Sequence, residues 1–93
     1  MFEVILKSRA EKEFSKLSLK LKQRFYEEFK HLSSNPFGCK IKKLQGADFG
    51  YRLRLGRWRI LFALFQKEKR IEVVDIFFKK GKEDYAKRLK LLP

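Results

Sequence analysis

The chain has few of the residues that form cross-links, backbone breaks and metal sites. Its 93 residues include one Cys, one His, two Pro and five Gly. A single Cys excludes an internal disulfide, and one Cys with one His cannot supply the ligands of a structural zinc site. Two Pro and five Gly exclude a low-complexity or collagen-like chain. The cytoplasm, where thiols stay reduced, is therefore the expected location.

Long apolar runs are also absent. The longest run covers residues 60–65, whereas a membrane-spanning helix needs about 20 apolar residues. The first six residues are apolar but include Glu3, and they lack the basic start and small-residue cleavage site of a signal peptide. We therefore expect one domain over residues 1–93, with no membrane association.

Charge, in contrast, is abundant and mostly of one sign. The sequence has 24 Lys and Arg against 11 Asp and Glu, which gives a net charge of +13. A hydrophobic content of 44% excludes a disordered basic tail. Solubility alone needs a net charge of only about 2–8 in a small domain. The excess predicts a polyanionic partner, with nucleic acid first and an acidic protein second.

The N-terminal third has the pattern of a strand followed by two helices. Residues 2–7 form a short apolar segment, and apolar residues then recur every three or four positions over 9–17 and 19–32. Ser8 and Ser18 precede these two segments and are predicted N-caps. We expect a helical hairpin with one apolar face.

The rest of the chain changes to strand periodicity. Apolar and polar residues alternate over 51–55, and apolar-rich segments follow over 58–65 and 70–78, which predicts three strands. A short C-terminal helix is expected over 82–92. The order β-α-α-β-β-β-α predicts an α+β fold, with the helical hairpin packed on one face of a twisted antiparallel sheet.

Several cations fall on these predicted strands. Arg52 and Arg54 are two residues apart, so they lie on one face of a strand, away from their apolar neighbours. Arg59 begins the next strand, and Lys79 follows the last one. Cations converging on one sheet face would bind phosphate oxygens. The alternative is a solvated face that carries scattered cations.

Two further residues in this region have more than one interpretation. Tyr85 follows the last strand and is suited to stacking on a base. Its spacing to Leu89 and Leu92 equally fits a residue that docks the last helix. Asp75 lies within a strand and is expected to pair with a neighbouring cation.

Three stretches of the sequence resemble the RelE/ParE toxin superfamily of toxin–antitoxin systems. They are K-I-K-K-L-Q-G (40–46), Y-R-L-R-L-G-R-W-R-I-L-F (51–62) and V-V-D-I-F-F-K-K-G-K-E-D-Y (73–85). The resemblance implies a small α+β toxin that an acidic antitoxin neutralises by wrapping around it. RelE-like members cleave mRNA in the ribosomal A site and so inhibit translation, whereas ParE-like members inhibit DNA gyrase.

The RelE-like branch implies a set of site residues. The catalytic residues would be Arg52, Arg54, Arg59, Lys79 and Tyr85. Contacts to messenger or ribosomal phosphates would come from Lys40, Lys42, Lys43, Arg57, Lys80 and Lys82. The chain departs from the branch at one of these positions, since Lys79 stands where Arg is common.

The implied reaction is endoribonuclease cleavage without a metal or other cofactor. The RNA 2′-hydroxyl would attack the adjacent phosphate, and arginines would stabilise the added negative charge. A lysine crowded by other cations can exchange a proton near neutrality, so Lys79 is the expected acid or base. Replacing Lys79 and Arg59 by Ala should abolish cleavage without unfolding the protein.

Two other functions remain open from the sequence. A ParE-like gyrase inhibitor would be a binding module that leaves RNA uncut. A decayed toxin would bind only RNA or its antitoxin. The presence of Arg59, Lys79 and Tyr85 together favours RNA cleavage.

Overall fold

The computed structural model describes residues 1–81, 85 and 87–93. In this part of the chain, five strands form one sheet in the order β1-β5-β4-β3-β2. The strands are β1 (Glu3–Leu6), β2 (Ile41–Lys43), β3 (Gly50–Leu55), β4 (Trp58–Phe65) and β5 (Arg70–Phe78). The predicted α+β class is confirmed. Four strands follow the two helices, whereas the sequence predicts three.

The sheet differs from the prediction in two ways. It is mixed rather than antiparallel, because β1 lies parallel to β5 with Glu3 opposite Arg70. The long connection through two helices and three strands permits this parallel pairing, and apolar alternation does not encode strand direction. The second difference is β2, a three-residue, lysine-rich edge strand paired with β3. Short edge strands rich in Lys give almost no strand signal.

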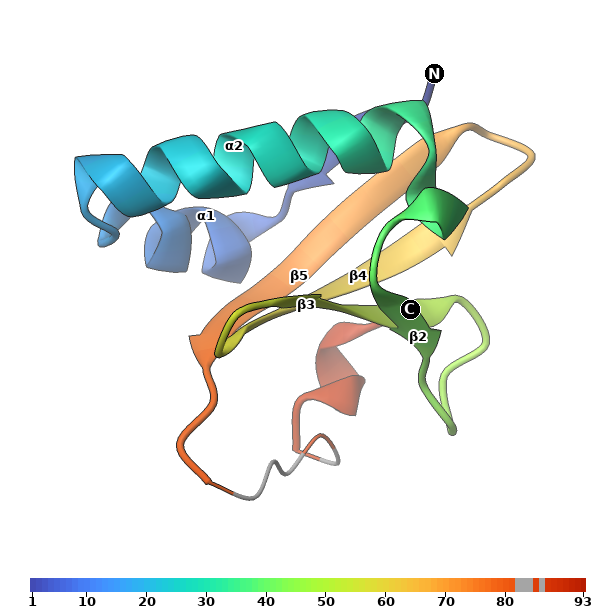
Figure 1. Ribbon diagram of the computed structural model, residues 1–93. Coiled ribbons are helices and arrows are strands. Elements are labelled where there is room, and N and C mark those ends of the chain that lie inside the picture. The colour runs from blue at the N-terminus through green and yellow to red at the C-terminus, as the bar shows by residue number, and fades with distance from the viewer. Residues whose placement is uncertain (82–84, 86) are drawn as a thin grey trace.

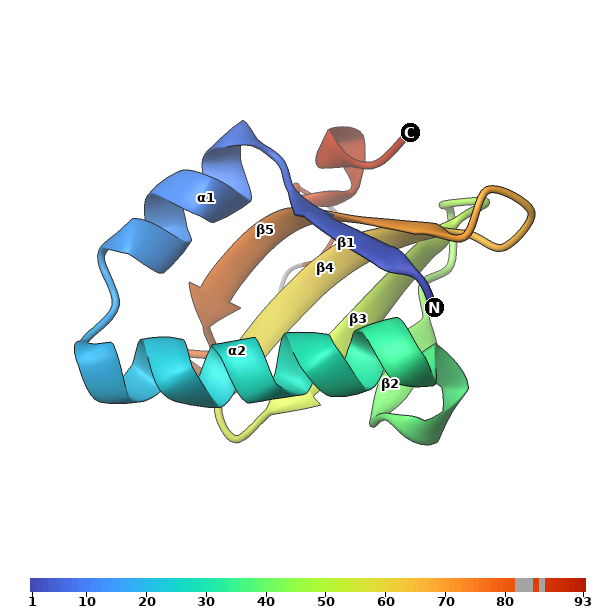
Figure 2. The same ribbon diagram turned by 90° about the horizontal axis from the view of Figure 1, so that it is seen from above.

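Both helices lie on one face of the sheet (Figures 1 and 2). They are α1 (Ser8–Ser15) and α2 (Leu19–Ser34). The Ser18 hydroxyl accepts a hydrogen bond from the Leu21 amide at 3.2 Å, so this predicted N-cap is confirmed. Ser8 is not a cap: Lys7 occupies the N-cap position of α1 and no side chain caps that end. No helix within the described residues is both long and apolar enough to cross a membrane.

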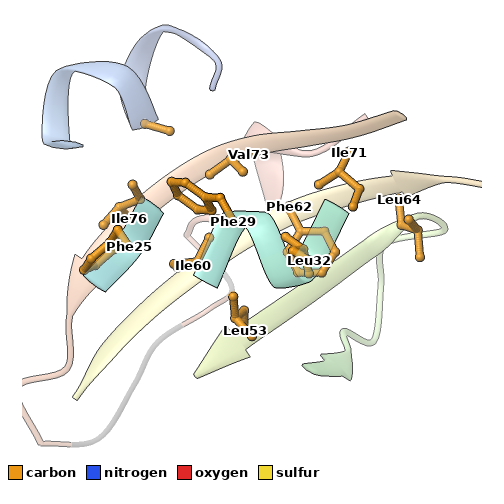
Figure 3. Close-up of a cluster of buried hydrophobic side chains, with 11 residues drawn as sticks. Phe25, Phe29, Leu32, Leu53, Ile60, Phe62, Leu64, Ile71, Val73 and Ile76 are labelled. Atoms are coloured by element: carbon orange, nitrogen blue, oxygen red, sulfur yellow. The ribbon is translucent and has the colours of Figure 1, made fainter. Parts of the chain in front are cut away.

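The main core lies between α2 and the sheet (Figure 3). Phe25 and Leu32 of α2 are fully buried there, and the Phe25 ring meets Trp58 of β4 edge-on at 5.6 Å. Sheet residues complete the cluster: Leu53, Ile60, Phe62, Leu64, Ile71, Val73 and Ile76. Each large side chain of this kind contributes roughly 1.5–3 kcal/mol by leaving water.

A β-bulge in β5 decides which side chains reach the other face. Leu61 pairs with Asp75 while the next residue, Phe62, pairs with Val73, so Val74 is an extra residue. Val73 and Ile76 consequently both join the core under the helices. Asp75 therefore lies on the opposite face, and so does Phe77.

The C-terminal segment crosses that opposite face (Figure 1). A helix was predicted over residues 82–92. Residues 82–84 and 86 lie outside the described residues, and the described part holds only a 3₁₀ turn, η2 (Leu89–Leu91). The predicted helix is therefore reduced to one turn where the structure describes it. Leu92 packs close to Gly50, where a Cβ would come within 2.7 Å of its Cδ1 atom.

Candidate functional site

The predicted cations meet in an open groove of about 650 Å³ on the sheet face opposite the helices. We call it the cationic groove. Its lining residues are Lys42, Lys43, Leu44, Gln45, Arg52, Arg54, Arg59, Lys79, Tyr85 and Leu89. The groove thus brings together all five residues predicted to be catalytic and two of those predicted to contact phosphates.

Strand register places like charges directly opposite one another in this groove. Arg54 of β3 is the cross-strand partner of Arg59 in β4, and Lys42 of β2 is the partner of Arg52. Side chains at opposed positions lie about 4.5–5.5 Å apart at Cβ, and like charges there destabilise the sheet. An anion seated between the two pairs would relieve this repulsion.

Arg59 has a structural role as well as a place in the groove. The residue is only 6% exposed. Its Nη1 atom donates to the Gly56 carbonyl at 2.9 Å and to the Trp58 carbonyl at 3.0 Å. Gly56 has a φ of +60° in the turn between β3 and β4, so Arg59 ties this tight turn to its strand. Removing Arg59 would therefore loosen the fold, contrary to the expectation from sequence.

Lys79 reaches the groove from a fixed backbone position after β5. Its amide donates to the Arg57 carbonyl at 2.7 Å. The Arg57 Nη2 atom donates back to the Lys79 carbonyl at 3.0 Å. The Arg57 guanidinium also lies over the Phe78 ring, 5.1 Å from its centroid. Arg57, predicted to contact phosphate, therefore does not line the groove and instead holds Lys79 in position.

Tyr85 lies in the groove and also packs against the sheet. It lines the cationic groove, and its ring packs edge-on against Phe77 of β5 at 5.9 Å. Arg88 approaches the same Phe77 ring, 3.8 Å from the centroid. The C-terminal segment thus forms one wall of the groove by docking on the sheet.

A second groove of about 590 Å³ lies toward α2 and meets the first at Arg54. Lys40, another predicted phosphate contact, lines this second groove. So do Arg24 and His31 of α2, which sequence reasoning did not select. Arg24 and His31 are seven residues apart and so lie on one face of α2, and this spacing is the sequence signal that could have identified them together.

Two predicted phosphate contacts, Lys80 and Lys82, remain to be placed. Lys80 is exposed and lines neither groove. Lys82 lies outside the described residues.

The single cysteine has no reactive environment. Burial, and then the Glu28 carboxylate, raise the pKa of the Cys39 thiol, which keeps it protonated and poorly nucleophilic. Over residues 1–81, 85 and 87–93, no group of three His, Cys, Asp or Glu side chains could hold a metal ion.

Comparison with known proteins finds similarity in structure but not in sequence. No protein-family model matches the chain, and no curated protein matches it. The isolated Escherichia coli RelE toxin superposes with a TM-score of 0.73 at 18% identity, over 97% of each chain. The fold is that of the RelE toxins.

Two complexes extend the RelE comparison. The RelE–RelB complex from Pyrococcus horikoshii matches with a TM-score of 0.75 at 23% identity, over 87% of this chain and 98% of that one. The RelBE2 toxin–antitoxin complex of Mycobacterium tuberculosis matches with a TM-score of 0.73 at 18% identity, over 84% of this chain and 98% of that one. The cationic groove is therefore built on a RelE fold with little sequence in common.

Proposed function

We propose that the protein is the toxin of a toxin–antitoxin pair and that it cleaves messenger RNA on the ribosome. The observation that carries the proposal is the pairing of like charges, Lys42 with Arg52 and Arg54 with Arg59, inside one groove. Such a groove favours a ligand with closely spaced negative charges. Its position on a RelE fold supports RNA as that ligand.

The groove residues suit attack of the RNA 2′-hydroxyl on the neighbouring phosphate. Arg52 and Arg54 would donate to the phosphate oxygens, whose negative charge increases in the transition state. Lys79 would exchange a proton with the attacking or the leaving oxygen. Tyr85 would stack on or orient a base beside the scissile bond. None of these steps uses a metal ion held by the protein.

An acidic antitoxin is the proposed regulator. Several of the solved structures with this fold are complexes of a toxin with its antitoxin. The net charge of +13 would favour an acidic segment that covers the cations and blocks RNA. We place the activity in the cytoplasm, where ribosomes translate messages.

The deciding experiment maps RNA ends by primer extension after the protein is induced in cells, with and without a block on translation. Cuts within translated messages that disappear when translation is blocked would support the proposal. Lys80→Ala is the matched control for Lys79→Ala, because Lys80 is adjacent and lines neither groove. Toxicity with intact messages would contradict RNA cleavage and lead to a DNA supercoiling assay for gyrase inhibition.

A further inference from the structure

A carboxylate is fully buried on the groove side of the sheet. Asp75 of β5 has no exposed surface. Its Oδ1 atom accepts from Arg9 Nε at 3.1 Å and from the Ile76 amide at 2.9 Å, and its Oδ2 atom accepts from Arg88 Nη1. The expected pairing of Asp75 with a cation is confirmed, and it involves two arginines from opposite ends of the chain.

Arg88 connects this carboxylate to the wall of the cationic groove. Its guanidinium pairs with Asp75 and also lies over the Phe77 ring at 3.8 Å. Tyr85 packs edge-on against the same ring at 5.9 Å. The Arg88 amide donates to the Tyr85 carbonyl at 2.9 Å, so both residues belong to one turn of backbone.

We propose that Asp75 and Arg88 form a latch that positions Tyr85 in the cationic groove. Asp75 is then a positioning residue, which acts through Arg88 and touches no substrate. The effect of the latch on RNA cleavage rests on the proposed function. The placement of the Tyr85 ring by the latch does not depend on that function.

The surroundings of Asp75 support a role in placement rather than in stability. Apolar side chains of Leu61 and Val74 are buried beside it in the sheet. A buried ion pair adds little net stability compared with apolar residues of similar size. Its hydrogen bonds are directional, however, and Oδ2 accepts one from the C-terminal segment. Apolar packing alone would let that segment slide along the sheet.

The first test compares Arg88→Gln with Arg9→Gln in the full chain. Each variant removes one of the two arginines that pair with the Asp75 carboxylate, but only Arg88 belongs to the turn that carries Tyr85. The probe is the nuclear Overhauser effect between the Tyr85 and Phe77 ring protons. The latch predicts that this signal disappears in Arg88→Gln and persists in Arg9→Gln.

Two outcomes would overturn the latch. One is a Tyr85–Phe77 signal that survives in Arg88→Gln, and the other is a signal that disappears equally in both variants. Arg88→Lys covers the case in which Arg88→Gln does not fold, because lysine keeps a positive charge for Asp75. Retention of the Tyr85–Phe77 signal in Arg88→Lys supports the latch, and its disappearance in a folded protein contradicts it.

The second test is a double-mutant cycle on cleavage. Arg88→Gln should lower the single-turnover rate by up to about 10²-fold, the cost that a misplacement of about 1 Å in a substrate-positioning group can reach, with little change in RNA affinity. In a Tyr85→Ala background it should have no further effect, because Arg88 acts through Tyr85. A further decrease in that background would overturn the latch. Absence of any cleavage would contradict the proposed function, and the Tyr85–Phe77 signal would still decide the latch.

Discussion

The arginines of the cationic groove have two different kinds of environment. Arg54 is exposed and Arg52 half-buried, and neither makes an ion pair or side-chain hydrogen bond with another residue in the described ranges 1–81, 85 and 87–93. Arg59 is buried and donates to two backbone carbonyls. Substitutions at these positions should therefore separate stability from function.

Replacing Arg59 by Ala should lower the free energy of unfolding by about 1.5–3 kcal/mol, because two carbonyls lose a charged donor. Arg54→Ala should change it by less than about 0.5 kcal/mol, since Arg54 is exposed. Urea denaturation followed by the fluorescence of Trp58, the only tryptophan, measures both. Equal decreases in stability in the two variants would show that Arg59 does not hold the turn.

Replacing Lys79 by Ala should slow cleavage about 10²–10⁴-fold, the usual contribution of a positioned acid or base. The fold should survive, because the Lys79 amide and carbonyl, rather than its side chain, bond to Arg57. Single-turnover cleavage of ribosome-bound message is the measurement, with Lys80→Ala as the control. A Lys79→Ala protein that cleaves at the normal rate would remove lysine from the proposed mechanism.

At the scale of elements, the two helices begin in different ways. The Ser18 hydroxyl caps α2, whereas no side chain caps α1. Ser18→Ala should therefore lower the free energy of unfolding by about 1 kcal/mol. Ser8→Ala, the matched change, should have almost no effect. Thermal denaturation of both variants tests the pair, and a larger decrease for Ser8→Ala would refute this capping assignment.

Periodicity predicted the elements that have a strong repeating pattern. The stripe through Phe25 and Leu32 identified α2, and alternation through Arg52 and Arg54 identified both β3 and the face on which its cations lie. Periodicity could not predict β2, whose three residues contain two lysines. Nor could it predict the bulge at Val74, which arises from pairing with β4 rather than from local propensity.

The candidate site was predictable to the extent that its residues lie on such strands. Their alternation placed the cations on one face, and the register of β4 then brought Arg59 beside Arg54. The burial of Arg59 was not predictable, because no sequence pattern marks its hydrogen bonds to the backbone carbonyls of Gly56 and Trp58. Arg24 and His31 were missed because only the packing of α2 brings them near Lys40.

At the scale of the whole molecule, the two grooves share Arg54, so we expect them to form one path for a long ligand. An RNA strand longer than the cationic groove should continue along this path. Lys40→Ala should then weaken binding of a ten-nucleotide RNA and leave a three-nucleotide RNA unaffected. For the longer RNA, the slope of log affinity against log salt should fall by about 0.7 for each phosphate that the variant no longer neutralises.

Lys20→Ala is the control for this measurement. It also removes one positive charge, but Lys20 lies on α2 and lines neither groove. Its salt slope should equal that of the unmodified protein. Equal weakening by Lys20→Ala and Lys40→Ala would indicate a diffuse charge effect instead of a path through the second groove.

The parallel pairing of β1 with β5 has a consequence for the time at which the cationic groove can form. β1 is synthesised before the other four strands of the sheet, yet it pairs with β5, which is synthesised after them. Arg9 and Asp75, which also bond, are 66 residues apart in sequence. Contacts this distant slow folding, because the intervening chain must be ordered first. A chain synthesised only as far as β4 therefore lacks β5, and with it the completed sheet and the groove. Translation must therefore pass residue 85 before all the residues that line the cationic groove are present.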